Sequence, residues 1–332
     1  MRALRLEGIQ QLSIVEVPDP LAAEGEAVVE IRAASLNHRD VWIRAGQYGG
    51  LKFPIIPGSD GAGVVTSVGR GVDPSWVGRD VIMNPALNWG PDERAQAPAF
   101  SILGLPRDGT LAECVSIPAT QLEAKPEHLS WEEAAALPLA GLTAWRAVFS
   151  RGDLGAKERI LITGIGGGTA LFALQFAVAS GATAWVTSSS SDKIARAVQL
   201  GATGGFLYTS SGWQTAAAQA SGLFDVIIDS SGGDGFGDLV NLCAPGGRIV
   251  FFGATRGNPP GIDQRKVFWR QISLLGSTMG SPQDWRAMLA FVARNQIRPV
   301  VSAVFPLDRG AEAFALMERG GQFGKIVVSV AK

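Results

Sequence analysis

A glycine-rich turn between two apolar segments constrains the fold of this chain more than any other feature. The apolar run Ile160–Thr163 ends in a cluster of four glycines, and a helical pattern follows until Gly181. A second apolar run, Ala184–Thr187, comes next. Strand, glycine turn, helix and strand in this order form the βαβ unit that binds dinucleotides.

The glycine turn is suited to a pyrophosphate, because it lets backbone N–H groups and a helix N-terminus approach the negative charge. Gly164, Gly167 and Ala170 keep the three-residue spacing of the motif, with alanine in a tolerated place. The alternative is a glycine-rich β–α turn that binds no nucleotide. We expect the cofactor contacts of this turn to come from Gly164, Gly166, Gly167, Gly168 and Thr169.

The residues after the second apolar run indicate which dinucleotide binds. An NAD site would carry an acidic residue here for the ribose 2′-hydroxyl. This chain has four serines, which include Ser188 and Ser189, and then Lys193. Hydroxyls and a cation suit a 2′-phosphate, so we predict NADP(H). On composition alone, the serine run is also typical of a flexible surface loop.

Length and composition describe a compact globular protein. The 332 residues are enough for two domains, with 46% hydrophobic residues, 18% charged residues and a net charge of −1. Such a charge gives no reason to expect nucleic acid or a membrane surface as a partner. No apolar run approaches the ~20 residues that span a bilayer. The first ten residues lack a secretion signal, and two cysteines support no disulfide framework. A cytoplasmic location is the default expectation.

The chain changes character near residue 130. Short β segments separated by glycine and proline turns fill the first ~120 residues. Ser130 and Glu133 then have the spacing of a capping box at the start of a helix. From Arg159 to about Gly253, strands and helices alternate, which predicts an α/β fold with a parallel sheet. The clearest strands are Leu12–Val17, Ala27–Ala33, Gly61–Val68, Asp80–Met83, Ile160–Thr163, Ala184–Thr187, Val226–Asp229, Ile249–Gly253 and, near the end, Lys325–Val330; residues 284–295 form an amphipathic helix.

Five segments stand out in order along the chain: LNHRDVWIRAGQY at 36–48, PGSDGAGVVTSVG at 57–69, DGTLAECVSIP at 108–118, AAALPLAGLTAW at 134–145 and GKIVV at 324–328. Together they make the chain resemble the medium-chain dehydrogenase/reductase superfamily. The resemblance covers essentially the whole chain and implies two domains. One is a β-rich GroES-like catalytic domain of residues 1–122 and 290–332, to which the C-terminal segment returns. The other is a Rossmann domain of residues 123–289.

The resemblance also bears on metal binding. The positions that hold the catalytic zinc in zinc-dependent members match Asn37, Ser59–Asp60 and about Leu139. A catalytic zinc needs about three protein ligands, and only Asp60 offers one here. We therefore predict no metal site, and the chain looks like the zinc-independent quinone oxidoreductase and enoyl reductase branch.

The expected absence of a metal narrows the class of substrate that the protein could reduce. Hydride addition to a plain ketone builds alkoxide charge that zinc would stabilise. In an enone or quinone the charge moves to a more distant oxygen, where a few hydrogen-bond donors suffice. The resemblance implies that Tyr48 donates a proton or orients the substrate, and that Asp40 supports the site. Asn37 would hydrogen-bond the substrate carbonyl or the nicotinamide ribose. The alternatives are a phenol packed at the domain edge for Tyr48 and a turn-stabilising amide for Asn37.

Further cofactor residues follow from the same resemblance. Lys193 and Tyr208 match residues that hold the 2′-phosphate, Thr143 matches a threonine that faces the nicotinamide, and Lys325 matches a cation that reaches the pyrophosphate. A surface lysine, a strand-end tyrosine and ordinary helix packing are the alternatives. Gly253, Ala254 and Thr255 follow a predicted strand at the carboxyl edge of the sheet, where ligands bind in such folds.

The favoured function is an NADPH-dependent, metal-free reductase of quinones or α,β-unsaturated carbonyls. A non-catalytic NADPH-binding regulatory or structural protein is the alternative, and an alcohol dehydrogenase is a weaker third. The partners expected are a small electrophile and, by analogy with relatives that pair through edge strands of the nucleotide domain, a second copy of the chain.

Overall fold

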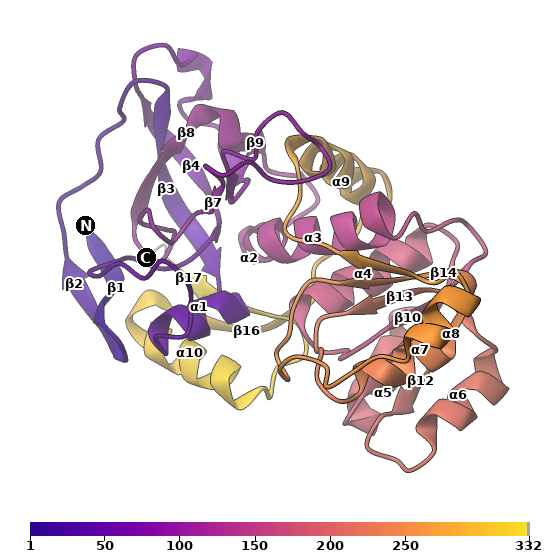
Figure 1. Cartoon of the computed structure of the whole chain (residues 1–332). Helices are drawn as coiled ribbons and strands as arrows, with labels where there is room; N and C mark the ends of the chain where they lie inside the picture. The colour runs from indigo at the N-terminus through magenta and orange to yellow at the C-terminus, as the bar shows by residue number, and fades with distance from the viewer. Residues whose placement is uncertain (331–332) are drawn as a thin grey trace. The chain divides into compact units, whose positions relative to one another are not determined.

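The computed structural model describes residues 1–330, which form two compact units (Figure 1). The first unit contains Met1–Ala140 and the segment from Ser281 onward, and the second contains Gly141–Gly280. None of the helices in residues 1–330 is long and apolar enough to span a membrane.

A seven-stranded sheet is the centre of the first unit. Its order is β16–β17–β3–β4–β5–β9, and β8 also pairs with β3. Only β16 and β17 are parallel to each other; the other pairs are antiparallel. The strands are β3 (Glu26–Ser35), β4 (Asp60–Val68), β5 (Asp80–Met83), β8 (Cys114–Pro118), β9 (Leu122–Ala124), β16 (Val301–Pro306) and β17 (Lys325–Ser329).

The first unit contains further elements outside this sheet. Two short antiparallel pairs are β1 (Arg2–Gly8) with β2 (Gln11–Glu16) and β6 (Ala86–Leu87) with β7 (Ser101–Ile102). The helices are α1 (His38–Arg44), α2 (Trp131–Ala136), α9 (Pro282–Arg294), α10 (Gly310–Arg319) and the start of α3 (Pro138–Trp145); the short helical turns are Pro74–Trp76, Ala119–Gln121 and Leu307–Arg309.

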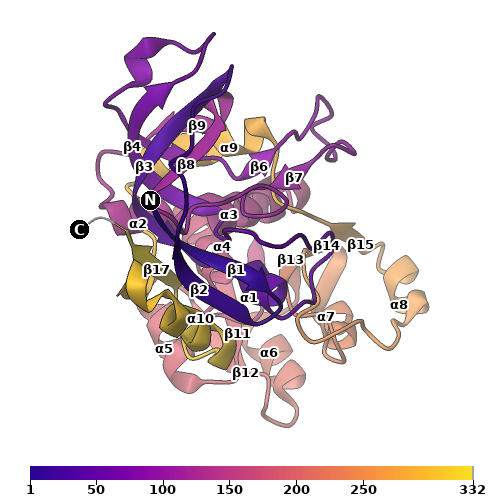
Figure 2. The same ribbon diagram turned by 90° about the vertical axis from the view of Figure 1, so that its left-hand side faces the viewer.

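The C-terminal segment of the chain lies in the first unit. Strand β17 lies between β16 and β3, with Val327 opposite Ser35. Helix α10 packs on β16 and β17, and the three elements lie together in Figure 1; Figure 2 shows α10 and β17 side by side from another direction. Phe314 of α10 and Ile326 and Val328 of β17 belong to the core of the unit.

Helix α2 explains why the observed division differs from the boundary expected at residue 122. It packs on β3, β4, β16 and β17, so it belongs to the first unit. Its N-terminus is the predicted capping box: the Ser130 hydroxyl accepts from the Glu133 N–H, and the Glu133 carboxylate accepts from the Ser130 N–H. The following helix, α3, runs across the observed boundary, and α9 begins just after the second boundary at Gly280.

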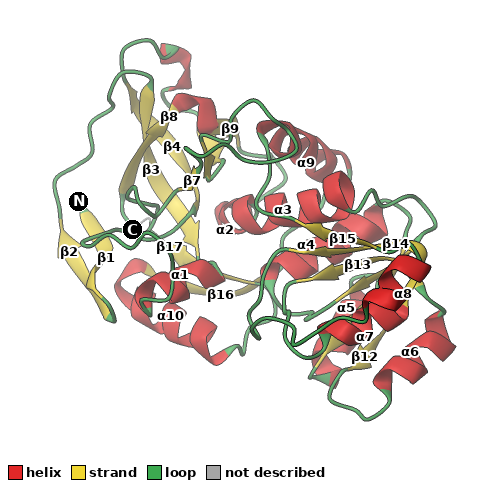
Figure 3. Ribbon diagram, in the orientation of Figure 1, coloured by secondary structure: helices red, strands yellow, loops and turns green. Residues whose placement is uncertain are grey.

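The second unit is a doubly wound α/β fold, as predicted. Its six strands are all parallel, in the order β12–β11–β10–β13–β14–β15, which is the Rossmann order 3-2-1-4-5-6. The strands are β10 (Arg159–Ile162), β11 (Thr183–Ser188), β12 (Gly204–Leu207), β13 (Phe224–Asp229), β14 (Cys243–Phe251) and β15 (Ser273–Gly276); the helices are α4 (Gly168–Ala179), α5 (Ser191–Gln199), α6 (Trp213–Ser221), α7 (Phe236–Leu242), α8 (Gln264–Trp269) and the π-helical turn Arg146–Arg151 (Figure 3).

Candidate functional site

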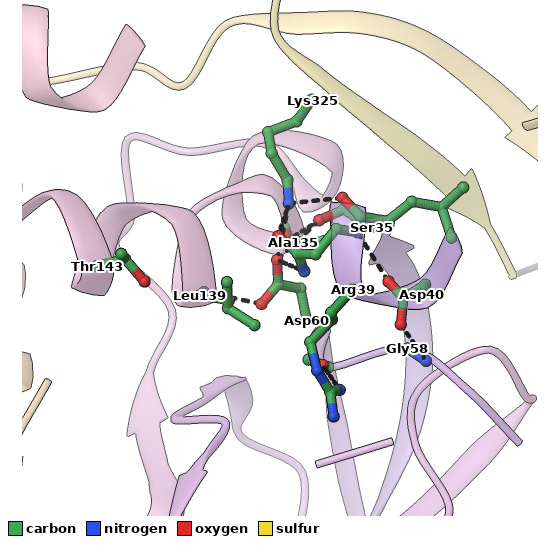
Figure 4. A network of polar contacts seen from close by, with 12 residues as sticks. Ser35, Arg39, Asp40, Gly58, Asp60, Ala135, Leu139, Thr143 and Lys325 are labelled. Atoms are coloured by element: carbon green, nitrogen blue, oxygen red, sulfur yellow. Dashed lines mark hydrogen bonds and ion pairs between the residues drawn. The ribbon is translucent and has the colours of Figure 1, made fainter. Parts of the chain in front are cut away.

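A buried polar cluster forms in the first unit where three strands begin or end. Strand β3 ends at Ser35, while β4 begins at Asp60 and β17 at Lys325. The antiparallel pairing puts Ser35 opposite both Asp60 and Val327, so residues far apart in sequence meet at one edge of the sheet. Asn37, two residues after the end of β3, completes this group, which we call the Asp60 cluster. Figure 4 shows Ser35, Asp60 and Lys325 of this cluster.

Asp60 is fully buried and accepts four hydrogen bonds. Its Oδ2 accepts from Lys325 Nζ at 3.0 Å, Asn37 Nδ2 at 2.8 Å and Ser35 Oγ at 3.1 Å. Its Oδ1 accepts from the Leu139 N–H at 2.8 Å. A carboxylate with this many donors is held in one orientation, because moving it would leave several buried groups unpaired.

Lys325 has all three of its N–H donors engaged within the first unit. Its Nζ donates to Leu36 O at 2.7 Å, to Asn37 Oδ1 at 2.6 Å and to Asp60 Oδ2 at 3.0 Å. Only 3% of the residue is exposed. The structure therefore gives Lys325 an ion-pair role, and its role at the pyrophosphate stays a prediction that requires it to give up one of these partners.

The same contacts determine the orientation of the Asn37 amide. Its oxygen accepts from a cation and its nitrogen donates to a carboxylate, so the two ends of the amide cannot be exchanged. The second Nδ2 hydrogen has no acceptor among residues 1–330. Asn37 thus keeps one donor for a ligand.

The residues at the zinc-matching positions do not fit a catalytic zinc. Asp60 is the single anionic side chain there, and the Lys325 ammonium lies on it. Zinc needs about three N, S or O ligands, and a cation among them would repel the metal. Within residues 1–330 no group of three or more His, Cys, Asp or Glu side chains lies together in a way that could hold a metal ion.

Asp40, predicted to support the catalytic site, acts as a cap at the start of α1. Its Oδ2 accepts from the Asn37 N–H at 2.7 Å, and its Oδ1 accepts from the Gly58 N–H at 3.4 Å. Complete burial raises the pKa of this carboxyl group, while the charge of Arg39 opposes that shift. Asp40 therefore connects the backbone of Asn37 to the loop before β4.

Tyr48 lies near the end of the segment that contains α1 and is half-buried. Its ring packs against a small apolar group formed by Leu6, Ile43, Ile55 and Leu105. Arg39 Nε donates to its hydroxyl oxygen at 3.4 Å, and the hydroxyl hydrogen has no acceptor among residues 1–330. Arg39 is a site residue that the sequence analysis missed, because an arginine in a helical turn carries no distinctive pattern.

The glycine turn of the second unit has the geometry that the motif requires. Gly164 and Gly166 have positive φ angles of 63° and 125°, which favour glycine. Gly167 caps α4, and Gly168 and Thr169 form its first turn. The Gly164 N–H donates to the Thr187 hydroxyl at 3.3 Å, which ties the turn to the end of β11.

Lys193 lies across the glycine turn. A Cβ placed on Gly166 would meet Lys193 Cδ at 2.9 Å and Nζ at 3.3 Å, so the lysine side chain follows the turn closely. Ser188 is buried and its hydroxyl accepts from the Ser190 N–H, whereas Ser189 is exposed. Ser190 caps α5, so the serine run forms an ordered strand end and helix start.

A pocket of about 280 Å³ opens at the carboxyl edge of the parallel sheet. Its walls include Thr163, Gly164, Thr187, Tyr208 and Arg256. The Arg256 guanidinium lies 5.5 Å from the centre of the Tyr208 ring, which adds a cation that the sequence analysis did not single out.

Asp229 and the loop after β14 shape the same edge. Asp229 accepts from the Thr163 hydroxyl at 2.6 Å and the Gly232 N–H at 2.8 Å, so it caps the turn that follows β13. Gly253, which precedes Ala254 and Thr255, lies so close to the Ser230 carbonyl that a Cβ would approach its oxygen to 2.8 Å. Thr143 lies elsewhere in the unit, buried on α3, with its hydroxyl 3.9 Å from Met279 Sδ.

A Rossmann unit combined with this β-rich unit defines a dehydrogenase-type protein, and comparison with known proteins agrees. Residues 23–127 match the alcohol dehydrogenase GroES-like domain, and residues 168–294 match the zinc-binding dehydrogenase family. The zinc-type alcohol dehydrogenase-like protein YogA of Leptosphaeria maculans is 34% identical, covering 96% of this chain and 94% of its own length. The chain belongs to the medium-chain dehydrogenase/reductase superfamily, a family of oxidoreductases.

Two further relatives carry different activities in their names. A crystal structure of an NAD-dependent alcohol dehydrogenase is 37% identical, with a TM-score of 0.93 and complete coverage of both chains. Crotonyl-CoA reductase of Streptomyces avermitilis is 29% identical, over 96% of this chain and 82% of its own length. The family contains both alcohol dehydrogenases and reductases of conjugated thioesters, so the residues of the site must decide between them.

Proposed function

We propose that this protein is an NADPH-dependent reductase that adds hydride to α,β-unsaturated carbonyl compounds or quinones without a metal. The observation that carries the proposal is the ion pair at the zinc-matching positions: Lys325 Nζ lies 3.0 Å from Asp60, the single carboxylate there. Resemblance to crotonyl-CoA reductase, an enzyme named for a conjugated substrate, supports the same assignment.

The substrate class follows from the charge that the reaction develops. A bound nicotinamide cofactor supplies the hydride. When hydride reaches the β-carbon of an enone, negative charge collects on the carbonyl oxygen, where neutral donors stabilise it. The Tyr48 hydroxyl and the second hydrogen of Asn37 Nδ2 are donors without an acceptor among residues 1–330. Tyr48 is also a group that can hold the proton needed at the α-carbon.

NADP(H) is the proposed cofactor. Lys193 places a cation along the glycine turn, and the exposed Ser189 adds a hydroxyl at the end of β11. Tyr208 and Arg256 line the pocket at the adjacent strand ends. A phosphate group favours such hydroxyls and cations, whereas a ribose 2′-hydroxyl would favour a carboxylate.

We also propose a homodimer that forms through the second unit. Strand β15 ends the sheet, with no partner on its outer side among the described strands. On the preceding helix, Trp269 is 82% exposed and Phe268 is 67% exposed. An open strand edge beside large exposed apolar side chains is typical of an interface.

The decisive experiment follows the oxidation of NADPH and NADH with purified protein and a panel of substrates. The panel contains quinones, enones, enoyl thioesters, simple aldehydes and ketones. Turnover of the conjugated compounds with NADPH, and little with NADH, is the expected result. Preferential turnover of simple aldehydes with NADH, together with stoichiometric zinc by metal analysis, would instead identify an alcohol dehydrogenase.

The same assay separates catalysis from a purely regulatory function. A protein that binds NADPH tightly but oxidises none of it across the panel would be a sensor or structural relative. In that case, Tyr48→Phe would leave NADPH binding and stability unchanged, since the phenyl ring keeps the packing of the phenol.

A further inference from the structure

Arg39 is a buried arginine held by neutral groups. It belongs to the first turn of α1, and only 7% of it is exposed. Its Nη1 donates to Ser59 Oγ at 2.6 Å and to Leu103 O at 2.9 Å. The Ser59 hydroxyl donates to the same Leu103 carbonyl at 2.8 Å, so one edge of the guanidinium is firmly fixed.

No carboxylate pairs with this guanidinium. Among residues 1–330, no carboxylate oxygen lies within 4.0 Å of an Arg39 guanidinium nitrogen, whereas arginines such as Arg2, Arg107 and Arg248 form ion pairs. Asp40 is the neighbouring charge, but both of its oxygens accept backbone N–H groups. Burying a charge without a counter-ion costs free energy, so a fold keeps such an arginine where an anion binds.

The other edge of the guanidinium is available. Arg39 Nη2 has no hydrogen-bond partner in residues 1–330. The nitrogen is not completely enclosed, so a ligand can reach it. Figure 4 shows the Arg39 side chain extending away from Lys325, so its charge is not directed into the Asp60 cluster. Two N–H donors on Nη2 therefore remain for a ligand.

Tyr48 lies against the same guanidinium. Arg39 Cζ is 5.0 Å from the centre of the Tyr48 ring, and Arg39 Nε donates to the Tyr48 hydroxyl oxygen. The tyrosine uses its oxygen as an acceptor and keeps its hydrogen, so the arginine and the tyrosine offer donors side by side. Ser59 and Tyr48 fix the arginine from two directions, which pre-organises the pair.

We propose that Arg39 and Tyr48 together bind the carbonyl oxygen of the substrate, and that Arg39 Nη2 stabilises the oxyanion formed during reduction. The inference rests on the proposed function. Hydride adds to the β-carbon, the C=C electrons move to form a double bond between the α-carbon and the carbonyl carbon, and the carbonyl π electrons move to oxygen. The resulting enolate oxygen accepts from Arg39. A proton from Tyr48 or water then reaches the α-carbon, which restores the carbonyl group, while the cofactor is left oxidised.

The test compares Arg39→Ala and Arg39→Lys with the surface variant Arg70→Gln, using cyclohexenone as substrate. Loss of one oxyanion donor lowers kcat by about 10²–10³-fold, so we expect a loss of this size in Arg39→Ala. Arg39→Lys keeps the charge but not the fork of donors and should be intermediate. Arg70, paired with Glu24 at the surface, should have no effect. The Kd for NADPH, measured by fluorescence, should be the same in all variants.

Chemical rescue distinguishes a role in the reaction from a role in folding. Methylguanidinium should raise the kcat of Arg39→Ala at least about ten-fold and leave the wild type and Arg70→Gln unchanged. A wild-type level of kcat in Arg39→Ala, or a low kcat that methylguanidinium fails to raise in a variant with a wild-type Tm, would overturn the inference and leave the proposed function standing. Absence of turnover in the wild type with every conjugated substrate would instead overturn the proposed function, and this inference with it.

Discussion

The Lys325 ammonium lies 3.0 Å from Asp60 Oδ2, although 265 residues separate the two in the sequence. Both side chains are buried, with 4% and 0% of their surface exposed. The pair gives the site a cation and an anion that are both supplied by side chains. It also orients the Asn37 amide, which bonds to both partners.

This relationship predicts a large and non-additive cost of breaking the pair. Lys325→Met leaves the Asp60 carboxylate buried without its counter-charge and should destabilise the first unit by about 3–5 kcal/mol. Asp60→Asn should cost a similar amount, and the double variant less than the two single effects combined. Urea unfolding measures all three. The exposed Arg309–Glu312 pair is the control, since Arg309→Met should change stability little.

The position of Lys193 predicts a change in cofactor preference. Lys193→Ala should raise the KM for NADPH about 10–100-fold, the worth of one charge-assisted hydrogen bond, and leave the KM for NADH unchanged. Arg265→Ala removes an equal charge from the surface of the same unit and serves as the control. Equal changes for both cofactors would mean that Lys193 does not contact the 2′-phosphate.

Tyr48 should affect turnover rather than cofactor binding. Tyr48→Phe removes the only hydrogen that the ring can donate, and kcat for an enone should fall by about 10²-fold or more. The phenyl ring still fills the apolar group around Ile43 and Ile55, so stability should be kept. Steady-state kinetics and NADPH titration separate the two effects, and an unchanged kcat would remove Tyr48 from the mechanism.

Two glycines in the second unit should respond to alanine in opposite ways. A Cβ on Gly204 would meet the Trp185 ring at 2.6 Å, so Gly204→Ala should cost about 1–3 kcal/mol. Gly237 lies in α7 with no atom closer than 4.0 Å to its Cβ position. Gly237→Ala should therefore stabilise the protein by about 0.5–1 kcal/mol, because alanine favours a helix. Thermal unfolding of both variants provides the comparison.

The two cysteines should resist thiol reagents in the folded protein. Burial raises the pKa of Cys243 to about 12, and it raises the pKa of the half-buried Cys114 as well. At pH 8 only about 10⁻⁴ of the Cys243 thiol would be ionised, so it should react only after unfolding. Time courses with a disulfide reagent, with Cys114→Ser to isolate the second thiol, measure this. Rapid modification of Cys243 in the native protein would show that its environment opens.

Strands that consist of a clear apolar run were predicted from the sequence. A strand that forms only through its packing against an adjacent strand was not. β10, β11 and β13 read as apolar runs, and their predicted bounds differ from the observed ones by only a few residues. β12 begins with two glycines, which disfavour strands. β12 forms because the Trp185 ring of β11 packs directly against Gly204, where a Cβ would clash. The same ring stacks on Phe206 of β12, with ring centres 5.2 Å apart.

The individual residues of the site could be predicted from the sequence, but their arrangement in space could not. Asn37, Asp60 and Lys325 each drew attention from the motif that contains them, but the sequence does not give the register that pairs β3 with both β4 and β17. Their mutual hydrogen bonds depend on that register. Arg39 was missed for a related reason, since the lack of a carboxylate around it is visible only once the neighbouring loops are placed.

The place of β17 between β16 and β3 also affects how the chain is assembled during synthesis. Residues 141–280 form one continuous unit, so they can fold as soon as they leave the ribosome. The sheet of the first unit has to wait with an open edge until β16 and β17 have been made, and Asp60 lacks its cation until Lys325 arrives. A chaperone that shields β3 during that interval would be most useful to this protein, and a nascent chain stalled before residue 301 should be its best substrate.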